Sequence, residues 1–155
     1  MIRTKRRWRL CIGLLCVNLV FIWGNSLLSA SASRAFSEWV FRLLTGGAPD
    51  VSQPGTLSGS GLLRKIAHFS EFCSLGMLLG WLFSMGHKHM GLAFLPGLGA
   101  ALIDEGLQFL APGRGPGLRD VCIDASGVAA GILLLLFGHD FIRKTKNKYS
   151  GGKRI

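Results

Sequence analysis

Four long apolar stretches constrain the fold of this chain more than any other feature of its sequence. Each is built mostly of Leu, Ile, Val, Phe, Ala and Gly, and they cover residues 10–29, 62–85, 92–110 and 121–142. A helix needs roughly 20 residues to cross a bilayer core that is about 30 Å thick. The joints between the stretches are rich in Ser, Gly and Pro. We therefore predict an all-α, polytopic membrane four-helix bundle.

The basic residues gather at the two ends of the chain and give it a formal net charge of +10. In a soluble protein such a balance would indicate nucleic-acid binding. Basic flanks of membrane spans, however, are retained in the cytoplasm. We predict a multi-pass protein of the cell membrane with no nucleic-acid partner. Its membrane domain covers residues 10–142, and its basic cytoplasmic tails are residues 1–9 and 143–155.

The start of the chain also fits a second interpretation. Basic residues, an apolar run and the small residues of "SLLSASASRA" together are similar to a secretory signal peptide. The apolar run is long for such a peptide, and Asn18 and Asn25 interrupt it. We therefore expect an uncleaved first span.

The segment after the first apolar stretch has the pattern of a short amphipathic helix. One helical stripe contains its apolar residues, which are Ala35, Phe36, Trp39, Val40, Leu43 and Leu44. Ser33 is placed to cap its start, Gly46 and Gly47 to end it, and Ser60 to cap the second span. We interpret the segment as an interfacial helix on the outer membrane surface. An ordinary surface helix packed on the bundle fits the pattern equally well.

The four cysteines, Cys11, Cys16, Cys73 and Cys122, all fall within predicted spans. None of them forms a C-x-x-C pair. Small buried apolar side chains explain them best, so we expect no disulfide.

Polar residues inside the apolar stretches lie near the predicted outer ends of the spans. The residues that share a helical face are Arg64, His68 and Glu71; Asp104 and Gln108; and Asp120, Asp124, Gly127 and Gly131. Small residues on the same faces let helices approach each other closely. We therefore expect three spans to direct these side chains into one outward-facing pocket.

The charges around this predicted pocket nearly balance. Its basic residues are Arg64, Lys65, Arg114 and Arg119, and its acidic residues are Glu71, Asp104, Glu105, Asp120 and Asp124. Unpaired buried charge costs several kcal/mol, so we expect the two sets to pair. In particular, the turn at Pro112 should bring Arg114 back to a carboxylate, which a guanidinium binds through two hydrogen bonds.

Two long motifs make the chain similar to the VanZ-like family of small bacterial membrane proteins. "RKIAHFSEF" follows R-K-x-x-H-F-x-E-[FY], and "DEGLQFLAPGRGPGLRDV" follows D-E-x-x-Q-x-[FLV]-x-P-G-R-x-x-x-x-x-D-[VI]. The resemblance extends from Gly24 to Gly138, with Asp124 at a position where the family usually has Asn. It implies a cell-envelope context and, from the namesake of the family, low-level resistance to the antibiotic teicoplanin. It implies no particular reaction.

Three classes of function stay open for this site. An intramembrane enzyme would use His68, Glu71, Asp104 and Asp120 as acid–base groups. A binding protein would hold a cell-wall precursor or a glycopeptide through substrate-binding residues, which are Arg64, Lys65, Glu105, Gln108, Arg114 and Asp124. A structural accessory subunit would use the same charges as an internal network. Membrane lipids are partners in every case.

The sequence also contains residues that could form a metal site. The spacing of His68 and Glu71 puts two ligand types on one helical face, near Asp104 and Asp120. The basic residues close by disfavour a cation, so we predict neither a metal nor a cofactor.

Overall fold

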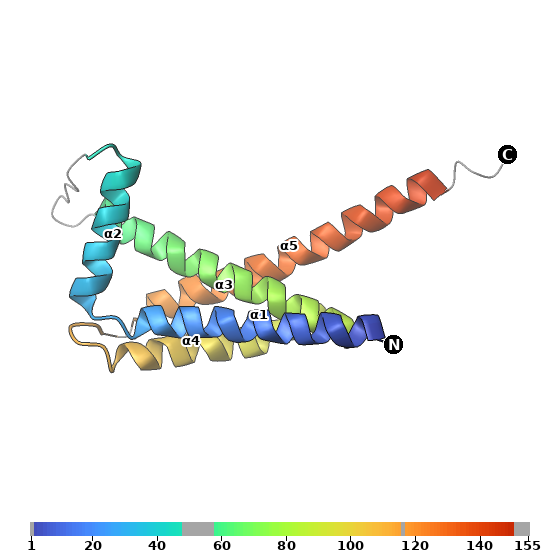
Figure 1. Cartoon of the computed structure of the whole chain (residues 1–155), viewed down its shortest axis with the longest axis horizontal. Coiled ribbons are helices and arrows are strands. Elements are labelled where there is room, and N and C mark those ends of the chain that lie inside the picture. Colours follow the sequence, from blue (N-terminus) through green and yellow to red (C-terminus); the bar gives the residue numbers. More distant parts are fainter. Residues whose placement is uncertain (1, 48–57, 116, 151–155) are drawn as a thin grey trace.

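A computed structural model describes residues 2–47, 58–115 and 117–150 of the chain (Figure 1). The described part is helical and contains no strand. Its elements are α1 (Ile2–Ser26), α2 (Ala30–Leu44), α3 (Gly59–Met85), the short 3₁₀ helix η1 (Met90–Ala93), α4 (Phe94–Gln108) and α5 (Leu118–Ser150). The prediction of an all-α membrane bundle is confirmed.

Four helical segments are long and apolar enough to cross a membrane, namely Lys5–Ser26, Gly59–Met85, Met90–Gln108 and Leu118–Phe141. Their number agrees with the sequence prediction, but nearly every boundary lies one to five residues from the predicted one. The first helix ends at Ser26 because Ser29 already caps α2, its Oγ accepting a hydrogen bond from the Ala32 amide. The last helix continues to Ser150, since the sequence has no Pro and no Gly between Gly138 and Gly151.

Glycines bring α3 and α5 into backbone contact where the two helices cross (Figure 1). A Cβ atom on Gly131 would lie 2.0 Å from the Cys73 carbonyl oxygen, and one on Gly76 would lie 2.2 Å from the Val128 carbonyl oxygen. Real Cβ atoms do not approach that closely, so no other residue fits without moving the helices apart. The predicted small-residue face of the last span is thus the α3–α5 seam.

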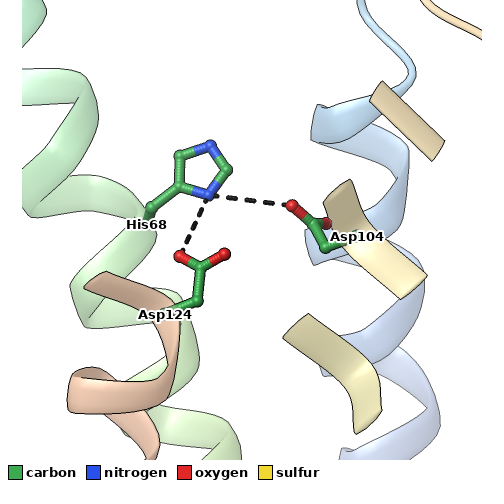
Figure 2. Close-up of side chains that lie close together, drawn as sticks. All are labelled: His68, Asp104 and Asp124. Carbon is green, nitrogen blue, oxygen red and sulfur yellow. Dashed lines mark ion pairs between the residues drawn. The ribbon is translucent and has the colours of Figure 1, made fainter. Parts of the chain in front are cut away.

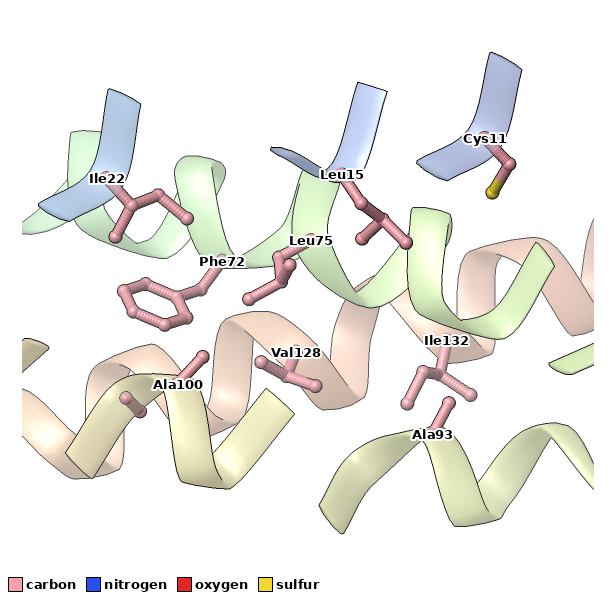
Figure 3. Close-up of a cluster of buried hydrophobic side chains, with 10 residues drawn as sticks. Cys11, Leu15, Ile22, Phe72, Leu75, Ala93, Ala100, Val128 and Ile132 are labelled. Carbon is pink, nitrogen blue, oxygen red and sulfur yellow. The ribbon is translucent and has the colours of Figure 1, made fainter. Parts of the chain in front are cut away.

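Apolar side chains from all four spans fill the space around this seam (Figure 3). Phe72 and Leu75 of α3 lie against Val128 of α5, and Ile22 of α1 closes the cluster. All four cysteines are free, but the expectation that they are buried is wrong for Cys16 and Cys122, which are exposed; only Cys11 is fully buried. The rest of the large apolar side chains are mostly exposed on the outside of the bundle, where a membrane protein contacts lipid.

Helix α2 crosses one end of the bundle, which we call the α2 end (Figure 1). The small residues Ala30, Ser33 and Ser37 form its buried side, while Phe36 and Trp39 are 65% and 60% exposed. Ser33 is therefore a packing residue and not the predicted cap, because only a side chain this small lets the helix sit against its neighbours. The exposed aromatic stripe is what a helix in the membrane surface requires.

The ends of α2 and the start of α3 are set by local hydrogen bonds. Gly46 and Gly47 end α2 with φ of 67° and 92°, a backbone conformation that favours glycine. Ser58, and not the predicted Ser60, caps α3, its Oγ accepting from the Gly61 amide. The cap lies two residues earlier because α3 includes two glycines ahead of the apolar stretch.

Candidate functional site

A cavity of about 480 Å³ opens at the α2 end of the bundle. Its wall is formed by α2, by the N-terminal turns of α3 and α5, by the last residue of α4, and by the loop that joins α4 to α5. The basic lining residues are Arg34, Arg64, Lys65 and Arg114, and the acidic ones are Asp120 and Asp124. His68 and Gln108 line it as well. We call this cavity the polar pocket.

Three ionisable side chains from three helices meet at the polar pocket, and we call them the trio (Figure 2). His68 Nδ1 of α3 lies 3.5 Å from an Asp124 carboxylate oxygen and 4.0 Å from an Asp104 carboxylate oxygen. Asp104 and Asp124 are both fully buried, with 0% of their surface exposed. The trio is therefore the most enclosed group of charges in the described part of the chain.

The glycines of the α3–α5 seam explain why Asp124 reaches His68. A Cβ on Gly127 would lie 2.5 Å from the carbonyl oxygen of Phe69, the residue after His68. The two backbones are thus in contact one helical turn below the trio. Asp124 precedes Gly127 by three residues and lies on the same helical face. Close backbone approach leaves its short side chain directly opposite the imidazole.

Hydrogen bonds from neutral groups hold Asp104 in place. Ser26 Oγ, at the end of α1, donates to Asp104 Oδ1 at 2.6 Å. Gln108 Nε2, one turn further along α4, donates to Asp104 Oδ2 at 3.3 Å. The carboxylate is therefore fixed between α1 and α4, and Oδ2 is the oxygen that faces His68.

The neighbouring carboxylates have different partners. Glu105 accepts hydrogen bonds from Gln108 Nε2 at 2.9 Å and from the backbone amide of Gly117 at 2.7 Å, which ties the turn before α5 to α4. Glu71 accepts a hydrogen bond from Asn25 Nδ2 at 3.0 Å. These two glutamates therefore fasten adjacent segments together.

The expected pairing of basic and acidic side chains is wrong for this structure. Among the side chains that the structure describes, only His68 lies within ion-pair distance of a carboxylate. Arg114 instead donates from Nη1 to the backbone carbonyl of Ser26 at 3.3 Å. The physical reason is distance, because hydroxyl, amide and backbone N–H groups lie closer to the buried carboxylates than any guanidinium does.

Arg114 is half-buried in the turn between α4 and α5, outside the spans. Burial lowers the pKa of its guanidinium from the ordinary value, and the nearby charge of Arg64 lowers that pKa further. Its Nε has no hydrogen-bond partner within the protein. Arg114 thus presents an incompletely satisfied guanidinium to the polar pocket.

The structure brings some of the predicted site residues together and places others elsewhere. His68, Asp104 and Asp124 form the trio, whereas Asp120 lines the pocket without belonging to it. Arg119 is exposed and does not line the pocket. The remaining predicted residues are placed as described above: Arg64, Lys65 and Arg114 at the pocket wall, Gln108 between two carboxylates, and Glu71 and Glu105 at helix contacts.

Three residues of the site were not predicted from the sequence. Arg34 of α2 lines the pocket, although the sequence pattern gave it no role in the site. Ser26 and Asn25 of α1 bind Asp104 and Glu71. Polar residues within an apolar stretch, as in "WGNSLL", were the signal that could have identified the α1 contribution.

The arrangement combines two kinds of chemistry. The basic side chains that line the pocket have no carboxylate partner, so they are suited to bind an anion. The trio supplies an imidazole and two carboxylates, a donor set suited to proton transfer or to a cation. An extended molecule with an anionic group would contact both.

Comparison with known proteins places the chain in a family. A family model described as VanZ/LLP1 matches residues 6–139, which include the whole polar pocket and all of the spans except residue 5 of the first and residues 140–141 of the last. No curated protein and no solved structure matches the chain. Because the matched region covers most of the 155 residues, this chain is a membrane protein of the VanZ/LLP1 family.

Proposed function

We propose that this protein binds an anionic group of a lipid-linked molecule of the cell envelope in the polar pocket. Through this binding it contributes to envelope homeostasis and to resistance to glycopeptides of the teicoplanin type. The observation that carries the proposal is the set of basic pocket residues, Arg34, Arg64, Lys65 and Arg114, which have no carboxylate within ion-pair distance in the described structure.

The pocket has the charge and the size for such a ligand. Guanidinium groups bind phosphate and carboxylate through two parallel hydrogen bonds, so Arg64 and Arg114 suit either group. Small-molecule sites have volumes of about 300–1,000 Å³. The cavity of about 480 Å³ falls within that range and accommodates a headgroup. A lipid chain would have to remain outside it.

Apolar surface beside the pocket provides a place for that lipid chain. Phe36 and Trp39 of α2 and Leu118 at the start of α5 are 65%, 60% and 82% exposed. Both elements also contribute pocket residues. A lipid-linked phosphate or peptidoglycan precursor matches this surface, since it joins an apolar chain to anionic groups. Its chain would lie against the bundle while its headgroup enters the pocket.

The proposal includes an orientation in the membrane. We propose that the α2 end faces the outside of the cell and that both termini lie in the cytoplasm. The basic flanks of the chain support this orientation through the positive-inside rule. Cell-wall precursors and glycopeptides are then on the same side as the pocket.

The experiment measures ligand binding by the purified protein in detergent. A polyprenyl phosphate is titrated in, with the polyprenyl alcohol of the same length as the uncharged comparison. We expect saturable binding of the phosphate only, and at least a tenfold weaker affinity for the double variant Arg64→Gln, Lys65→Gln. Arg42→Gln, at an exposed position of α2 outside the pocket, is the matched control.

Equal binding of the phosphate and the alcohol would contradict the proposal, and so would an unchanged affinity of the double variant. A second measurement addresses resistance. Cells that express the wild type should grow at higher teicoplanin concentrations than cells that express the double variant at equal membrane abundance. Equal sensitivity of the two strains would remove the resistance part of the proposal and leave the binding part in place.

A second candidate function is an intramembrane enzyme that acts on the same ligand. One observation favours it: His68 lines the pocket with two buried carboxylates beside its Nδ1, while Nε2 points away from both (Figure 2). A carboxylate that orients an imidazole leaves the other nitrogen as a general base. Mass spectrometry of the ligand after incubation separates the two functions, because only an enzyme returns it chemically changed.

A further inference from the structure

We propose that His68, Asp104 and Asp124 together bind one divalent metal ion of the zinc or manganese class at the polar pocket. This inference stands on the trio alone and does not depend on the identity of any pocket ligand. It departs from the expectation drawn from the sequence, in which nearby basic residues disfavoured a cation.

The geometry of the trio suits a metal centre. One donor atom from each of the three side chains can be chosen so that all lie within 4.8 Å of one another. Metal–ligand distances of about 2.0–2.2 Å place the ligand atoms of a tetrahedral ion about 3.4 Å apart. The observed 3.5 Å between His68 Nδ1 and Asp124 Oδ1 already matches, and the 4.0 Å to Asp104 Oδ2 needs only a small rotation.

Asp124 provides an independent sign that a ligand is expected here. Its side chain is fully buried, yet neither carboxylate oxygen accepts a hydrogen bond within the protein. The contact with His68 Nδ1 at 3.5 Å exceeds the range of about 2.7–3.2 Å for N–H···O hydrogen bonds. Buried carboxylates in proteins are otherwise paired, hydrogen-bonded or bound to a metal. A metal ion beside the imidazole would supply the short contact that the Asp124 carboxylate lacks.

The charges point the same way. Two ionised carboxylates with a neutral imidazole carry −2, and even a protonated imidazole leaves −1. No arginine or lysine side chain that the structure describes approaches a carboxylate within 4.0 Å, so Arg114 acts on Asp104 only over a longer distance. A divalent ion with a neutral imidazole brings the trio to zero. Neutralisation matters here because unbalanced charge is costly inside a bilayer-spanning bundle.

Surrounding contacts orient the donors for this role. Ser26 and Gln108 fix Asp104 so that Oδ2 faces His68. Hydrogen bonds of this kind to a ligating carboxylate commonly set metal affinity. His68 and Asp124 also line the polar pocket, so an ion held by them would face the cavity. Three protein ligands and one open position describe a zinc site that accepts a further ligand.

The donor set limits the choice of ion. Imidazole favours zinc and other late transition metals, whereas carboxylate also suits manganese, magnesium and calcium. One nitrogen with two oxygens therefore favours zinc or manganese over magnesium. A cysteine thiolate would have favoured zinc over manganese, but the trio contains none.

The experiment uses the full chain, purified in detergent and stripped of metal with a chelator. ZnCl₂, MnCl₂ and MgCl₂ are titrated separately by calorimetry. We expect one equivalent of zinc or manganese to bind saturably and to raise the melting temperature, with magnesium at least tenfold weaker. Asp124→Asn and His68→Gln should each weaken the binding of the preferred ion at least tenfold and remove its effect on the melting temperature.

Two matched variants separate the trio from adventitious ligands. His87→Gln removes a histidine from the loop after α3, and Asp140→Asn removes an exposed acid from the other end of α5. Both should bind the ion like the wild type. If Asp124→Asn is poorly folded, the comparison of metal affinity between the wild type and His68→Gln tests the inference instead.

Two results would overturn the inference. The first is a wild type that binds no zinc or manganese at one equivalent, which would make the trio an imidazole shared between two carboxylates. The second is binding that survives the loss of His68 or Asp124, which would place the ion elsewhere. Neither result affects the phosphate titration, because that proposal rests on the basic pocket residues and not on the trio.

Discussion

Replacement of Gly131 by alanine tests the packing on which the whole site depends. The added Cβ would lie 2.0 Å from the Cys73 carbonyl oxygen and 2.9 Å from the Met77 amide nitrogen. Ordinary contacts begin near 3.4 Å, so α3 and α5 must separate by about 1.4 Å. The obstructing atoms belong to backbone and cannot rotate away as a side chain would.

The magnitude follows from two opposing terms. Overpacking a tight contact costs about 1–3 kcal/mol, and backbone obstruction favours the upper half of that range. Alanine gains up to about 1 kcal/mol over glycine in helix propensity. We expect a net destabilisation of about 1–2 kcal/mol, which is roughly a five- to thirtyfold change in the folding equilibrium.

The assay is unfolding in mixed micelles with a rising fraction of SDS, followed by the fluorescence of the four tryptophans. Gly138→Ala is the matched control, because it lies on the same helix with nothing within 4 Å of the added Cβ. It should equal or slightly exceed the wild type in stability. If Gly131→Ala unfolds at the same SDS fraction as Gly138→Ala, the backbone contact between the helices is not the basis of the bundle.

Three further predictions test other parts of the structure. Ser26→Ala removes a hydroxyl that donates to a buried carboxylate, and it should lower the free energy of unfolding by about 1–3 kcal/mol in the same assay; an unchanged midpoint would contradict that contact. Arg114→Ala loses one bond to a backbone carbonyl and should cost only about 0.5–1.5 kcal/mol, so a loss above about 3 kcal/mol would indicate a buried ion pair after all. A phosphatase that is active only outside the cell should be active when fused after Gly47 and inactive after Lys88, and the reverse pattern would overturn the proposed orientation.

The spans and the location of the site could be predicted because both depend on local sequence. Apolar length alone indicates a membrane helix. The helical period then places His68, Asp104 and Asp124 near one end of the bundle. The Gly127 and Gly131 pair predicted a close helix contact, although only the structure shows that α3 is the partner.

The individual contacts could not be predicted because they depend on angles between helices. Asp120 and Asp124 share one helical face, and the sequence does not distinguish which of them meets His68. The crossing of α3 and α5 decides it in favour of Asp124. Charge counting failed for Arg114 in the same way, since balance in a list of residues does not establish contact in space.

The polar residues of α1 have a consequence for the synthesis of this protein. Asn18 donates to Ser74, and Asn25 donates to Glu71, residues that lie 56 and 46 positions further along the chain. When α1 first enters the bilayer, neither asparagine has its partner. An unpaired amide in hydrocarbon costs several kcal/mol, so α1 gains its full stability there only after α3 arrives.

The later helices also depend on the order in which they enter the membrane. Asp104 enters with α4, when Ser26 and His68 are already in the membrane to receive it. Asp124 enters last, with α5. A ribosome-bound chain that ends before α5 would therefore hold an incomplete trio. Release of α1 from the insertion machinery should follow the emergence of α3, and crosslinking of stalled chains of increasing length would time that step.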